Sequence, residues 1–382
     1  MYFTTVNPDA PGGTAPDASA HDNRRTDEMT ADGGRRMDVT ILICTRNRSQ
    51  LLGETLDVLA KVSVPPGWRC EVLVVDNNST DDTVKTVMDR VADYPLPLRY
   101  LHEATPGKSS AMNAGIAASN ATILACTDDD VRVGRNWLEA SCGPLLDGGD
   151  GGEHSYTGGP VRPIWDGPCP DWFPRTPSNL WGTIAILDYG PKPFTFEDER
   201  KVPLGANFAI QRDLIDRVGG FVPSLGRSTT RTLLGQELPE LFRRAHAADA
   251  RGLYVPEMEV FHHIPARRLT PSYCRRWWFG KGVSRARVDR MHPITELGID
   301  LRSTPHLAGL PKFMIGDAAR ELWRWLAALV RRDFPERVNI ESRLCYFLGY
   351  AWQRLREPRR AVPPQAAPPP ATPPRTRVAQ LK

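Results

Sequence analysis

Three consecutive aspartates, Asp128, Asp129 and Asp130, form the densest group of chemically active side chains in the sequence. They follow residues 121–126, an apolar run typical of a buried strand. Carboxylates packed this closely repel one another unless a cation joins them. Clusters of oxygen ligands suit Mg²⁺ or Mn²⁺, which bind one or two carboxylates together with substrate phosphates. The alternative is a solvated acidic turn or a helix N-terminus before Trp137.

A second candidate is the segment Pro-Gly-Lys-Ser-Ser at 106–110, which opens a predicted helix. Helix N-termini bind phosphate, and Lys108 adds a positive charge there. The segment is not a complete P-loop, because the first glycine of that motif would fall at His102. The alternative is an ordinary helix N-cap with an exposed lysine.

Polar residues also follow two other apolar runs. Asp76 comes directly after residues 72–75, and Thr45 and Arg46 come directly after residues 39–44. A carboxylate in the position of Asp76 can accept hydrogen bonds from a base or a ribose hydroxyl. Capping of the next helix is a compatible alternative.

The second half of the chain offers further candidates. His262 and His263 follow a short predicted strand, and either could bind a metal or a phosphate, although a lone histidine is more often structural. Glu237 and Glu240 lie near the start of a predicted helix, where the helix dipole favours carboxylates. Residues 265–290 carry eight basic side chains and one acid, interrupted by Trp277, Trp278 and Phe279. This segment could bind phosphate, a membrane surface or nucleic acid, or be a solvated basic helix face.

The elements that position these residues alternate along the first half of the chain. Apolar runs predict strands, and helical spacing of apolar residues predicts the helices between them. The strands are expected at 39–44, 71–76, 98–101 and 121–126, and the helices at 49–61, 83–91 and 109–119. Strands joined by single helices indicate a parallel α/β sheet with right-handed connections. Ligands bind beyond the carboxyl ends of such strands, so the candidates above should meet at one edge.

The remainder of the chain is more irregular. Residues 159–207 are rich in proline, tryptophan and glycine and predict a long ordered loop around a site. Two or three helices are expected over 271–357. The stretch 317–332 has Leu322, Trp325, Leu326 and Leu329 on one face with arginines around it. Such a helix most often packs on the core, and docking on anionic lipid is the alternative.

Composition limits the class of protein. The 382 residues carry a net charge of +4, too mild to indicate nucleic acid as the partner. The seven cysteines include no C-x-x-C pair, which favours a reducing cytosol over disulfides or structural zinc. No apolar run is long enough to span a bilayer, and no secretory signal is visible. We expect disordered tails at 1–36 and 358–382, and the latter is proline-rich.

Eight segments in order together resemble the family 2 glycosyltransferases of GT-A fold. They are VTILICTRNR at 39–48, VVDNNSTD at 74–81, PGKSSAMNAGI at 106–116, TDDDV at 127–131, LGANFAIQRD at 204–213, VGGF at 218–221, GQELPE at 235–240 and YVPEMEVFHH at 254–263. The resemblance implies a Rossmann-like, mostly parallel sheet with flanking helices over 37–270. A C-terminal helical extension would cover 271–357.

The resemblance implies a role for each matching residue. Those expected to bind the nucleotide-sugar donor (a UDP-, GDP- or dTDP-sugar) are Thr45, Arg46, Asp76, Lys108, Asn113, Asp128, Asp129 and Asn207. Asp130 would bind a divalent metal, Mn²⁺ or Mg²⁺, and His263, which aligns slightly better than His262, would help to hold it. The family's usual stereochemistry implies inversion at the sugar.

The catalytic base departs from the family pattern. Many members carry Glu-Asp where this chain has Glu237 and Leu238, and there the aspartate is often the base. We therefore expect Glu237 to deprotonate the acceptor hydroxyl. Because of Leu238, a non-catalytic nucleotide-sugar binding protein on a degenerate GT-A scaffold is the alternative function.

Two other functions fit the sequence less well. A nucleotidyltransferase usually needs a glycine-rich loop after the first strand, and residues 45–48 contain no glycine. A nucleic-acid binder conflicts with the mild charge and the strand-end aspartates. The acceptor is expected to be a carbohydrate or a lipid-linked compound. The protein would be cytoplasmic, with a peripheral contact at the inner membrane face left open.

Overall fold

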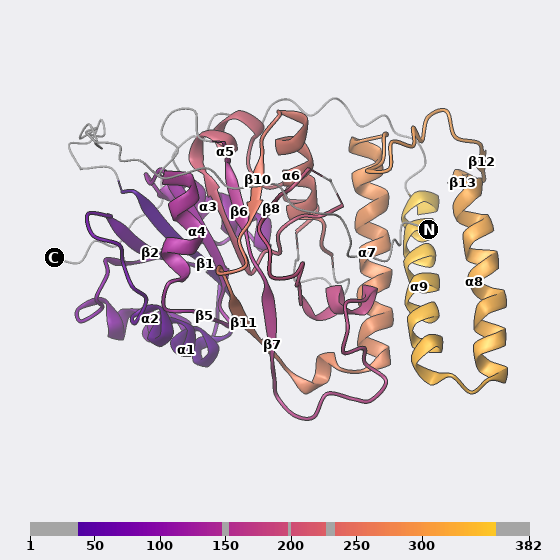
Figure 1. The fold of residues 1–382 in the computed structure, drawn as a ribbon, viewed down its shortest axis with the longest axis horizontal. Helices are drawn as coiled ribbons and strands as arrows, with labels where there is room; N and C mark the ends of the chain where they lie inside the picture. Colours follow the sequence, from indigo (N-terminus) through magenta and orange to yellow (C-terminus); the bar gives the residue numbers. More distant parts are fainter. Residues whose placement is uncertain (1–36, 147–152, 198–199, 227–233, 357–382) are drawn as a thin grey trace.

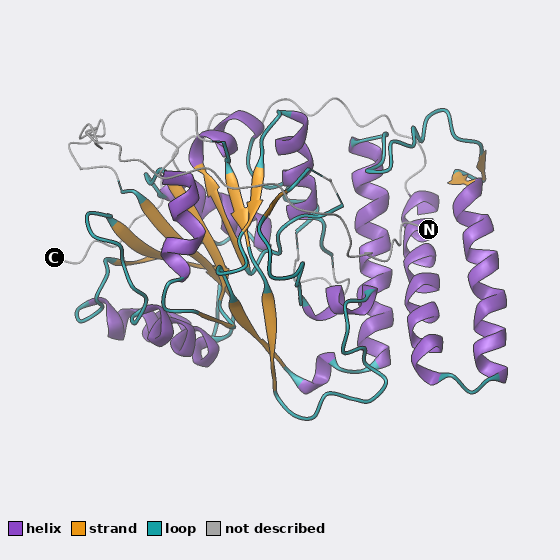
Figure 2. Cartoon of the chain, in the orientation of Figure 1, coloured by secondary structure: helices purple, strands orange, loops and turns teal. Residues whose placement is uncertain are grey.

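The computed structural model of the chain describes residues 37–146, 153–197, 200–226 and 234–356 (Figure 1). The two predicted tails, 1–36 and 358–382, lie outside the described residues. The described part consists of a central sheet with helices on both faces, followed by three long C-terminal helices (Figure 2).

The central sheet has eight strands in the order β3-β2-β1-β4-β9-β6-β10-β8. The four strands predicted from the sequence pair in parallel, β3 with β2, β2 with β1 and β1 with β4. β9 then pairs antiparallel with β4 and β6, β10 runs parallel to β6, and β8 closes the edge antiparallel. The strands are β1 (Val39–Thr45), β2 (Cys70–Asp76), β3 (Leu98–His102), β4 (Ile123–Asp128), β6 (Tyr156–Gly158), β8 (Phe194–Thr195), β9 (Asn207–Gln211) and β10 (Gly252–Tyr254).

Helices cover both faces because the sheet is apolar on both. In β1, Ile41 and Ile43 point into one hydrophobic cluster and Leu42 into the other. The first cluster is closed by α1 (Ser49–Leu59), α2 (Thr83–Val91) and α4 (Trp137–Leu146), and the second by α3 (Lys108–Ala118), α5 (Arg212–Val218) and α6 (Glu237–Ala247). This three-layer arrangement confirms the predicted α/β class with a mostly parallel sheet.

A second, three-stranded sheet lies next to the carboxyl end of β4. β11 (Val260–Ile264) runs antiparallel to β5 (Val131–Val133) and parallel to β7 (Val161–Trp165). The loop after β7 contains the 3₁₀ helix η1 (Asn179–Ile184), and η2 (Ala266–Arg268) follows β11. Trp165, Trp172 and Trp181 pack against a small hydrophobic cluster in this region, which orders the tryptophan-rich loop.

The C-terminal region consists of α7 (Pro271–Met291), the two-stranded hairpin β12 (His306–Leu307) and β13 (Leu310–Pro311), α8 (Lys312–Val330) and α9 (Phe334–Arg356). α9 lies between α7 and α8 (Figure 1). Gly282 and Gly349 let α7 and α9 approach closely, because a Cβ at either position would overlap a backbone carbonyl of the other helix. None of the described helices has both the length and the apolar character needed to cross a bilayer.

The orientation of α8 differs from the sequence prediction. The three leucines of the predicted stripe, Leu322, Leu326 and Leu329, are exposed, whereas Trp325 is half-buried and its indole N–H donates to Glu341 of α9 at 3.1 Å. The buried residues of α8 are Met314, Asp317, Glu321 and Ala328, and Glu321 forms an ion pair of 2.8 Å with Arg343 while both side chains are buried. The expectation that this stripe packs on the core was therefore wrong.

Candidate active site

A cavity of about 1100 Å³ lies at the carboxyl ends of β1 and β4, with the start of α6 and one side of α7 as further walls. The predicted site residues that line it are Thr45, Arg46, Lys108, Asp128, Asp129, Asp130 and Glu237. Polar lining residues to which the sequence analysis gave no individual role include Arg48, Asn77, Arg200, Lys201, Arg268, Lys281, Arg285 and Glu296, together with His262 in place of His263. Most of these are basic, which suits an anionic ligand.

The middle aspartate of the triplet is turned inward. The hydroxyl of Thr45 donates to Asp129 Oδ2 at 2.7 Å, and an Arg48 guanidinium nitrogen lies 2.7 Å from Oδ1. Burial raises the pKa of Asp129 to about 6, and Arg48 acts in the opposite direction. The same arginine nitrogen lies 2.8 Å from Asp130 Oδ2. Asp129 and Arg48 therefore hold the loop after β1 against the turn after β4.

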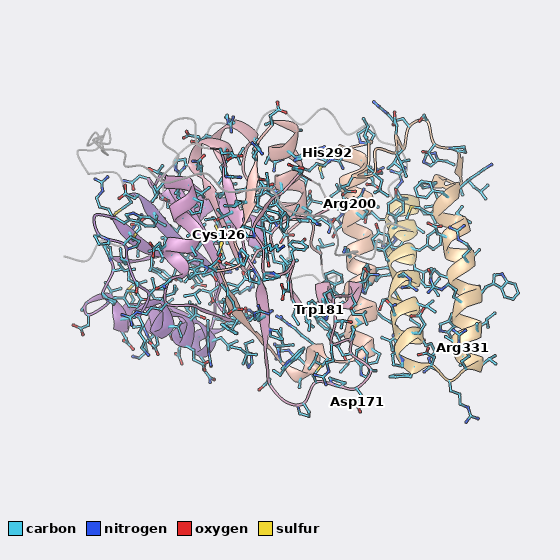
Figure 3. All side chains as sticks on the ribbon, in the orientation of Figure 1. Cys126, Asp171, Trp181, Arg200, His292 and Arg331 are labelled. Carbon is cyan, nitrogen blue, oxygen red and sulfur yellow. The ribbon has the colours of Figure 1, made fainter. Side chains whose placement is uncertain are left out.

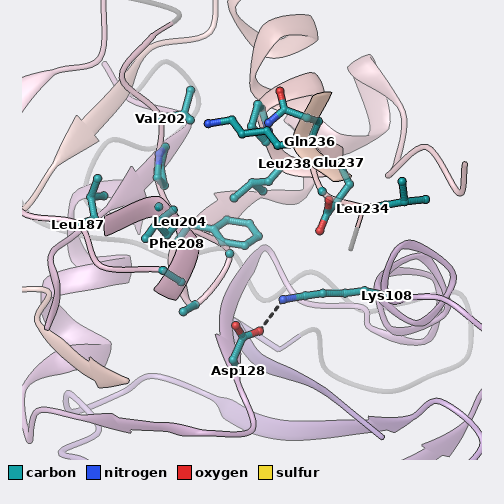
Figure 4. Close-up of a pocket in the computed structure, with 18 of the residues that line it drawn as sticks. Lys108, Asp128, Leu187, Val202, Leu204, Phe208, Leu234, Gln236, Glu237 and Leu238 are labelled. Carbon is teal, nitrogen blue, oxygen red and sulfur yellow. Dashed lines mark hydrogen bonds and ion pairs between the residues drawn. The ribbon is translucent and has the colours of Figure 1, made fainter. Parts of the chain in front are cut away.

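The first aspartate faces the start of α3. Lys108, the first residue of that helix, places its Nζ 2.6 Å from Asp128 Oδ1 (Figure 4). Burial raises the pKa of Asp128, but the nearby ammonium outweighs this and holds the pKa below its ordinary value. Gly107 precedes the helix with φ of 137°, a conformation that side chains rarely adopt, and this turn directs Lys108 toward the aspartates.

The third aspartate faces β11 and η2. His262 Nε2 lies 3.4 Å from Asp130 Oδ1, and Arg268 approaches Oδ2 at 3.8 Å. Burial opposes ionisation of Asp130, but the imidazole and the two arginines hold its pKa well below the usual range. His262 Nδ1 lies 3.1 Å from the carbonyl oxygen of Ile184, which can only accept, so Nδ1 carries the proton.

His263, the predicted metal ligand, points elsewhere. Successive side chains of a strand point to opposite faces, so only one of the two histidines can face Asp130. The ring of His263 lies near Asp166, with 3.8 Å between Nε2 and Oδ1, while its backbone N–H donates to the Asp130 carbonyl at 2.9 Å. The structure thus brings His262, not His263, to the aspartates.

Asp76 is buried beneath the cavity and does not line it. Its Oδ2 accepts a hydrogen bond from the Tyr100 hydroxyl at 2.8 Å, and its Oδ1 accepts one from the Ser79 N–H at 2.9 Å. The next residue, Asn77, lines the cavity and accepts a hydrogen bond of 2.7 Å from Gly107 N–H. Asn77 Nδ2 donates to the carbonyl oxygens of Glu103 and Thr105 at 3.2 and 2.7 Å, so this side chain holds the turn after β2 where it borders the cavity.

Two predicted asparagines also lie off the cavity, tied to the backbone. Asn113 exchanges two hydrogen bonds of 2.8 Å with the backbone of Phe221 and so joins α3 to the segment after α5. Asn207 is fully buried, accepts from Trp137 Nε1 at 2.9 Å and donates to two carbonyl oxygens. With these groups engaged, both asparagines position the chain around the site.

The start of α6 presents a carboxylate to the cavity. Glu237 Oε2 is buried and has no hydrogen-bond partner among the described residues. Figure 4 shows the carboxylate pointing into the cavity on the side of Lys108. Gln236 directly before it has φ of 118°, which is rare for a residue with a side chain and costs conformational energy. Leu238 after it is 6% exposed and packs in the core under α6.

Glu240, the other carboxylate of this turn, forms ion pairs with neighbouring side chains of the protein. Arg244 contacts both of its oxygens at 2.9 and 2.8 Å, and His292 Nε2 lies 3.0 Å from Oε1. Figure 3 shows His292 at the end of α7 next to α6. Glu240 therefore joins these two helices and leaves Glu237 to face the cavity.

The described residues contain no group of three or more His, Cys, Asp or Glu side chains that could by themselves hold a metal ion. Asp130 and His262, with Asp128 nearby, offer part of a coordination shell. Such a partial set suits a cation that also binds substrate phosphates.

Comparisons of the sequence agree with this arrangement. The profile described as glycosyl transferase family 2 matches residues 40–213. A glucosyl-dolichyl phosphate glucuronosyltransferase of Haloferax volcanii is 24% identical over 261 residues, 67% of this chain and 79% of the relative. A beta-monoglucosyldiacylglycerol synthase of Nostoc is 30% identical over 102 residues, which cover 26% of this chain and 22% of that protein.

The fold is similar to that of a solved mannosyltransferase from Pyrobaculum calidifontis, in complex with GDP-Man and Mn²⁺. The TM-score is 0.50 at 18% identity, and the match covers 87% of this chain and 91% of that one. The profile match includes β1 to β4 and the aspartate triplet, which form one end of the cavity. Residues 40–213 thus form a glycosyl transferase family 2 region, and the protein is a transferase with the GT-A fold.

Proposed function

We propose that the protein transfers a sugar from a nucleoside diphosphate sugar to an acceptor hydroxyl, with inversion at the anomeric carbon. One observation carries the proposal: a single cavity unites the aspartate triplet and its surrounding cations with Glu237, whose Oε2 has no hydrogen-bond partner among the described residues. The first group suits a diphosphate with a divalent cation, and the second suits proton removal.

The donor would occupy the end of the cavity formed by β1, β2 and β4. Thr45 and Arg46 line this end and would contact the nucleoside, and Asn77 would hold the turn beside it. Asp76 would act from beneath, through the turn that it holds. Lys108 and Asp128 would lie at the ribose and diphosphate, where the ammonium balances phosphate charge. Arg48 and Arg268 supply further positive charge beside Asp130.

A divalent metal, Mn²⁺ or Mg²⁺, fits the residues at Asp130. In the metal-bound protein, a neutral imidazole with its proton on Nδ1 would offer the lone pair of His262 Nε2, which lies 3.4 Å from Asp130 Oδ1, to the cation that this carboxylate also binds. In this structure a guanidinium nitrogen of Arg268 lies 3.4 Å from His262 Nε2 and supplies positive charge at this position. When bound, the metal would neutralise charge on the departing nucleoside diphosphate.

Glu237 would act as the general base. In a single displacement, the acceptor oxygen forms a bond to the anomeric carbon as the bond from that carbon to the diphosphate oxygen breaks. The proton of the acceptor hydroxyl passes to the carboxylate of Glu237, whose Oε2 has no competing partner among the described residues. Attack from the face opposite the leaving group inverts the configuration.

The acceptor is proposed to be lipid-linked and to be met at the inner face of a membrane. Leu322, Trp323, Leu326 and Val330 form the outward stripe of α8, with exposures of 52%, 74%, 40% and 83%. Arg331 lies at the end of this helix and is exposed (Figure 3). An apolar stripe with arginine at its end suits an anionic lipid surface. Two of the similar proteins are named for glycolipid synthesis.

Leu238 favours one alternative, a non-catalytic nucleotide-sugar binding protein. Where the family often has its base, this chain has a core leucine. Sugar transfer that depends on Glu237 separates the two functions, because a binding protein would take up the donor without turnover.

A thermal-shift screen tests the donor site directly. UDP, GDP, dTDP and CDP would each be added with and without Mn²⁺ to the wild type and to Asp130→Asn. A ligand that binds only the native state stabilises it by about 2.7 kcal/mol at a hundredfold excess over Kd. We expect one diphosphate to give a metal-dependent shift that is lost in Asp130→Asn. The absence of a shift with all four would rule out the site as described.

A further inference from the structure

Lys281 lies on the α7 wall of the cavity, in a stripe of residues spaced one helical turn apart. Trp277, Lys281 and Arg285 follow one another at intervals of four residues and all line the cavity. The Lys281 ammonium lies 5.2 Å from the ring centroid of Trp277 and 4.7 Å from that of Trp278. Two aromatic faces therefore support a cation that borders the open space.

The charge of Lys281 is not balanced by the protein. Among the described residues it has no hydrogen bond or ion pair, and its only recorded contacts are the two rings. Glu296, the nearest acid that influences it, is paired with Arg285 instead. Burial and then the neighbouring Arg285 lower the pKa of Lys281 to about 8. A cation kept in such a place is stabilised when a ligand supplies the anion.

The neighbours of α7 place this cation on the acceptor side of the cavity. Ser284, on the next turn, accepts a hydrogen bond of 3.1 Å from the N–H of Gly235, two residues before Glu237. At the other end, the ring of Trp277 borders η1 at Gly182, and η1 also orients His262 through Ile184. The α7 wall thus runs from the proposed base to the aspartates, beyond the strand ends that would bind the nucleotide.

We propose that Lys281 binds a phosphate group carried by the acceptor. Trp277 and Trp278 would contact the adjoining apolar or sugar part of that molecule. Arg285 would not be the primary ligand, because Asp289 already holds its guanidinium at 2.6 Å and Glu296 holds another nitrogen. The inference rests on the proposed function, since it assigns the acceptor class of the same cavity. The donor's own diphosphate has the same chemistry, and the experiment must separate the two sources.

The test measures binding of hexyl phosphate and of hexyl glucoside by titration calorimetry, with the cavity's donor end filled by the nucleoside diphosphate found in the screen. The variants are Lys281→Gln, Lys281→Arg and, as a matched control, Lys201→Gln. Lys201 also lines the cavity and also lies over an aromatic ring, 4.9 Å from the centroid of Phe194. Thermal unfolding confirms that each variant is folded.

We expect hexyl phosphate to bind the wild type and to bind Lys281→Gln at least about tenfold more weakly, equivalent to about 1.4 kcal/mol. Lys281→Arg and Lys201→Gln should stay close to the wild type, and hexyl glucoside should be insensitive to all three changes. Affinity for the nucleoside diphosphate should also be unchanged.

Several results would overturn the proposal. No binding of hexyl phosphate to the wild type, or equal binding to folded Lys281→Gln, would do so. Equal weakening in Lys201→Gln would show only a diffuse charge effect. Loss of nucleoside diphosphate affinity in Lys281→Gln would assign the lysine to the donor. If no nucleotide binds the wild type, the proposed function fails, and the hexyl phosphate titration without nucleotide still tests Lys281.

Discussion

Replacing Glu237 by glutamine tests the catalytic assignment most sharply. Glutamine keeps the shape of the side chain but cannot accept a proton at neutral pH. The chain offers no evident substitute in this turn, because Leu238 is apolar and both oxygens of Glu240 are bound by Arg244. The variant should therefore lose the base without losing the cavity.

The expected magnitude follows from the role and the contacts. A positioned general base contributes about 10²–10⁴-fold in rate, so kcat should fall by a factor in that range. This corresponds to about 2.7–5.4 kcal/mol of activation free energy. Glu237 Oε2 makes no hydrogen bond with a described residue, so little stability should be lost. The helix dipole at this position contributes only about 0.3–1 kcal/mol.

The assay compares initial rates of nucleoside diphosphate release, donor affinity and thermal unfolding for Glu237→Gln and Glu240→Gln. The two residues lie one turn apart on α6, so the second variant is a matched control. Glu240→Gln should unfold more easily because Arg244 and His292 lose a charged partner, while its kcat stays near the wild-type value once folded. Wild-type turnover in Glu237→Gln, or a rate loss explained by weaker donor binding, would refute the assignment.

Three further predictions concern stability and location. Gly282→Ala should destabilise the protein by about 1–3 kcal/mol in urea unfolding, because its Cβ would overlap the Tyr346 carbonyl, whereas Gly316→Ala on α8, where the added Cβ meets nothing, should not. Burial opposes ionisation of Glu240, but His292 and Arg244 lower its pKa in the folded protein. The ionised carboxylate therefore stabilises the folded state above the unfolded-state pKa of about 4.3, and this stabilisation is lost as the pH falls through the pKa of Glu240 in the folded protein. The difference in unfolding free energy between wild type and Glu240→Gln should accordingly shrink on acidification, and a constant difference would contradict this. Trp323→Ser with Leu326→Ser should reduce sedimentation with vesicles containing phosphatidylglycerol, and equal sedimentation of the double variant would exclude the α8 stripe as the contact.

Much of the N-terminal half of the chain could be predicted from local patterns. The predicted strand 39–44 is observed as Val39–Thr45, and the predicted helix 83–91 is observed as Thr83–Val91. Strands buried on both faces are continuous apolar runs, so their ends are visible in the sequence. In a parallel sheet those ends meet at one edge, which is why Thr45, Lys108 and the aspartate triplet were expected together.

The direction of individual side chains could not be predicted in this way. Asn113 and Asn207 lie in matching segments, but their amides hold backbone groups of distant residues. His262 faces Asp130 because β11 pairs with β5 in the register that sets His262 opposite Val131. A register shift of one residue would present His263 instead, and single-sequence patterns do not specify register between strands so far apart.

The sequence by itself determined the alternating α/β domain, the family, and the strand ends that carry Thr45 and the aspartates, because these depend on short-range apolar patterns. Only the tertiary structure decided which polar groups are left for a ligand. Glu237 Oε2 and the Lys281 ammonium face the cavity and make no hydrogen bond or ion pair with a described residue. Glu240 is instead paired with Arg244, and Asn207 accepts a hydrogen bond from Trp137. The same holds for α8, whose three leucines are exposed while Glu321 forms a buried ion pair with Arg343 of α9. Such outcomes depend on contacts between residues far apart in the chain, and local periodicity does not encode them.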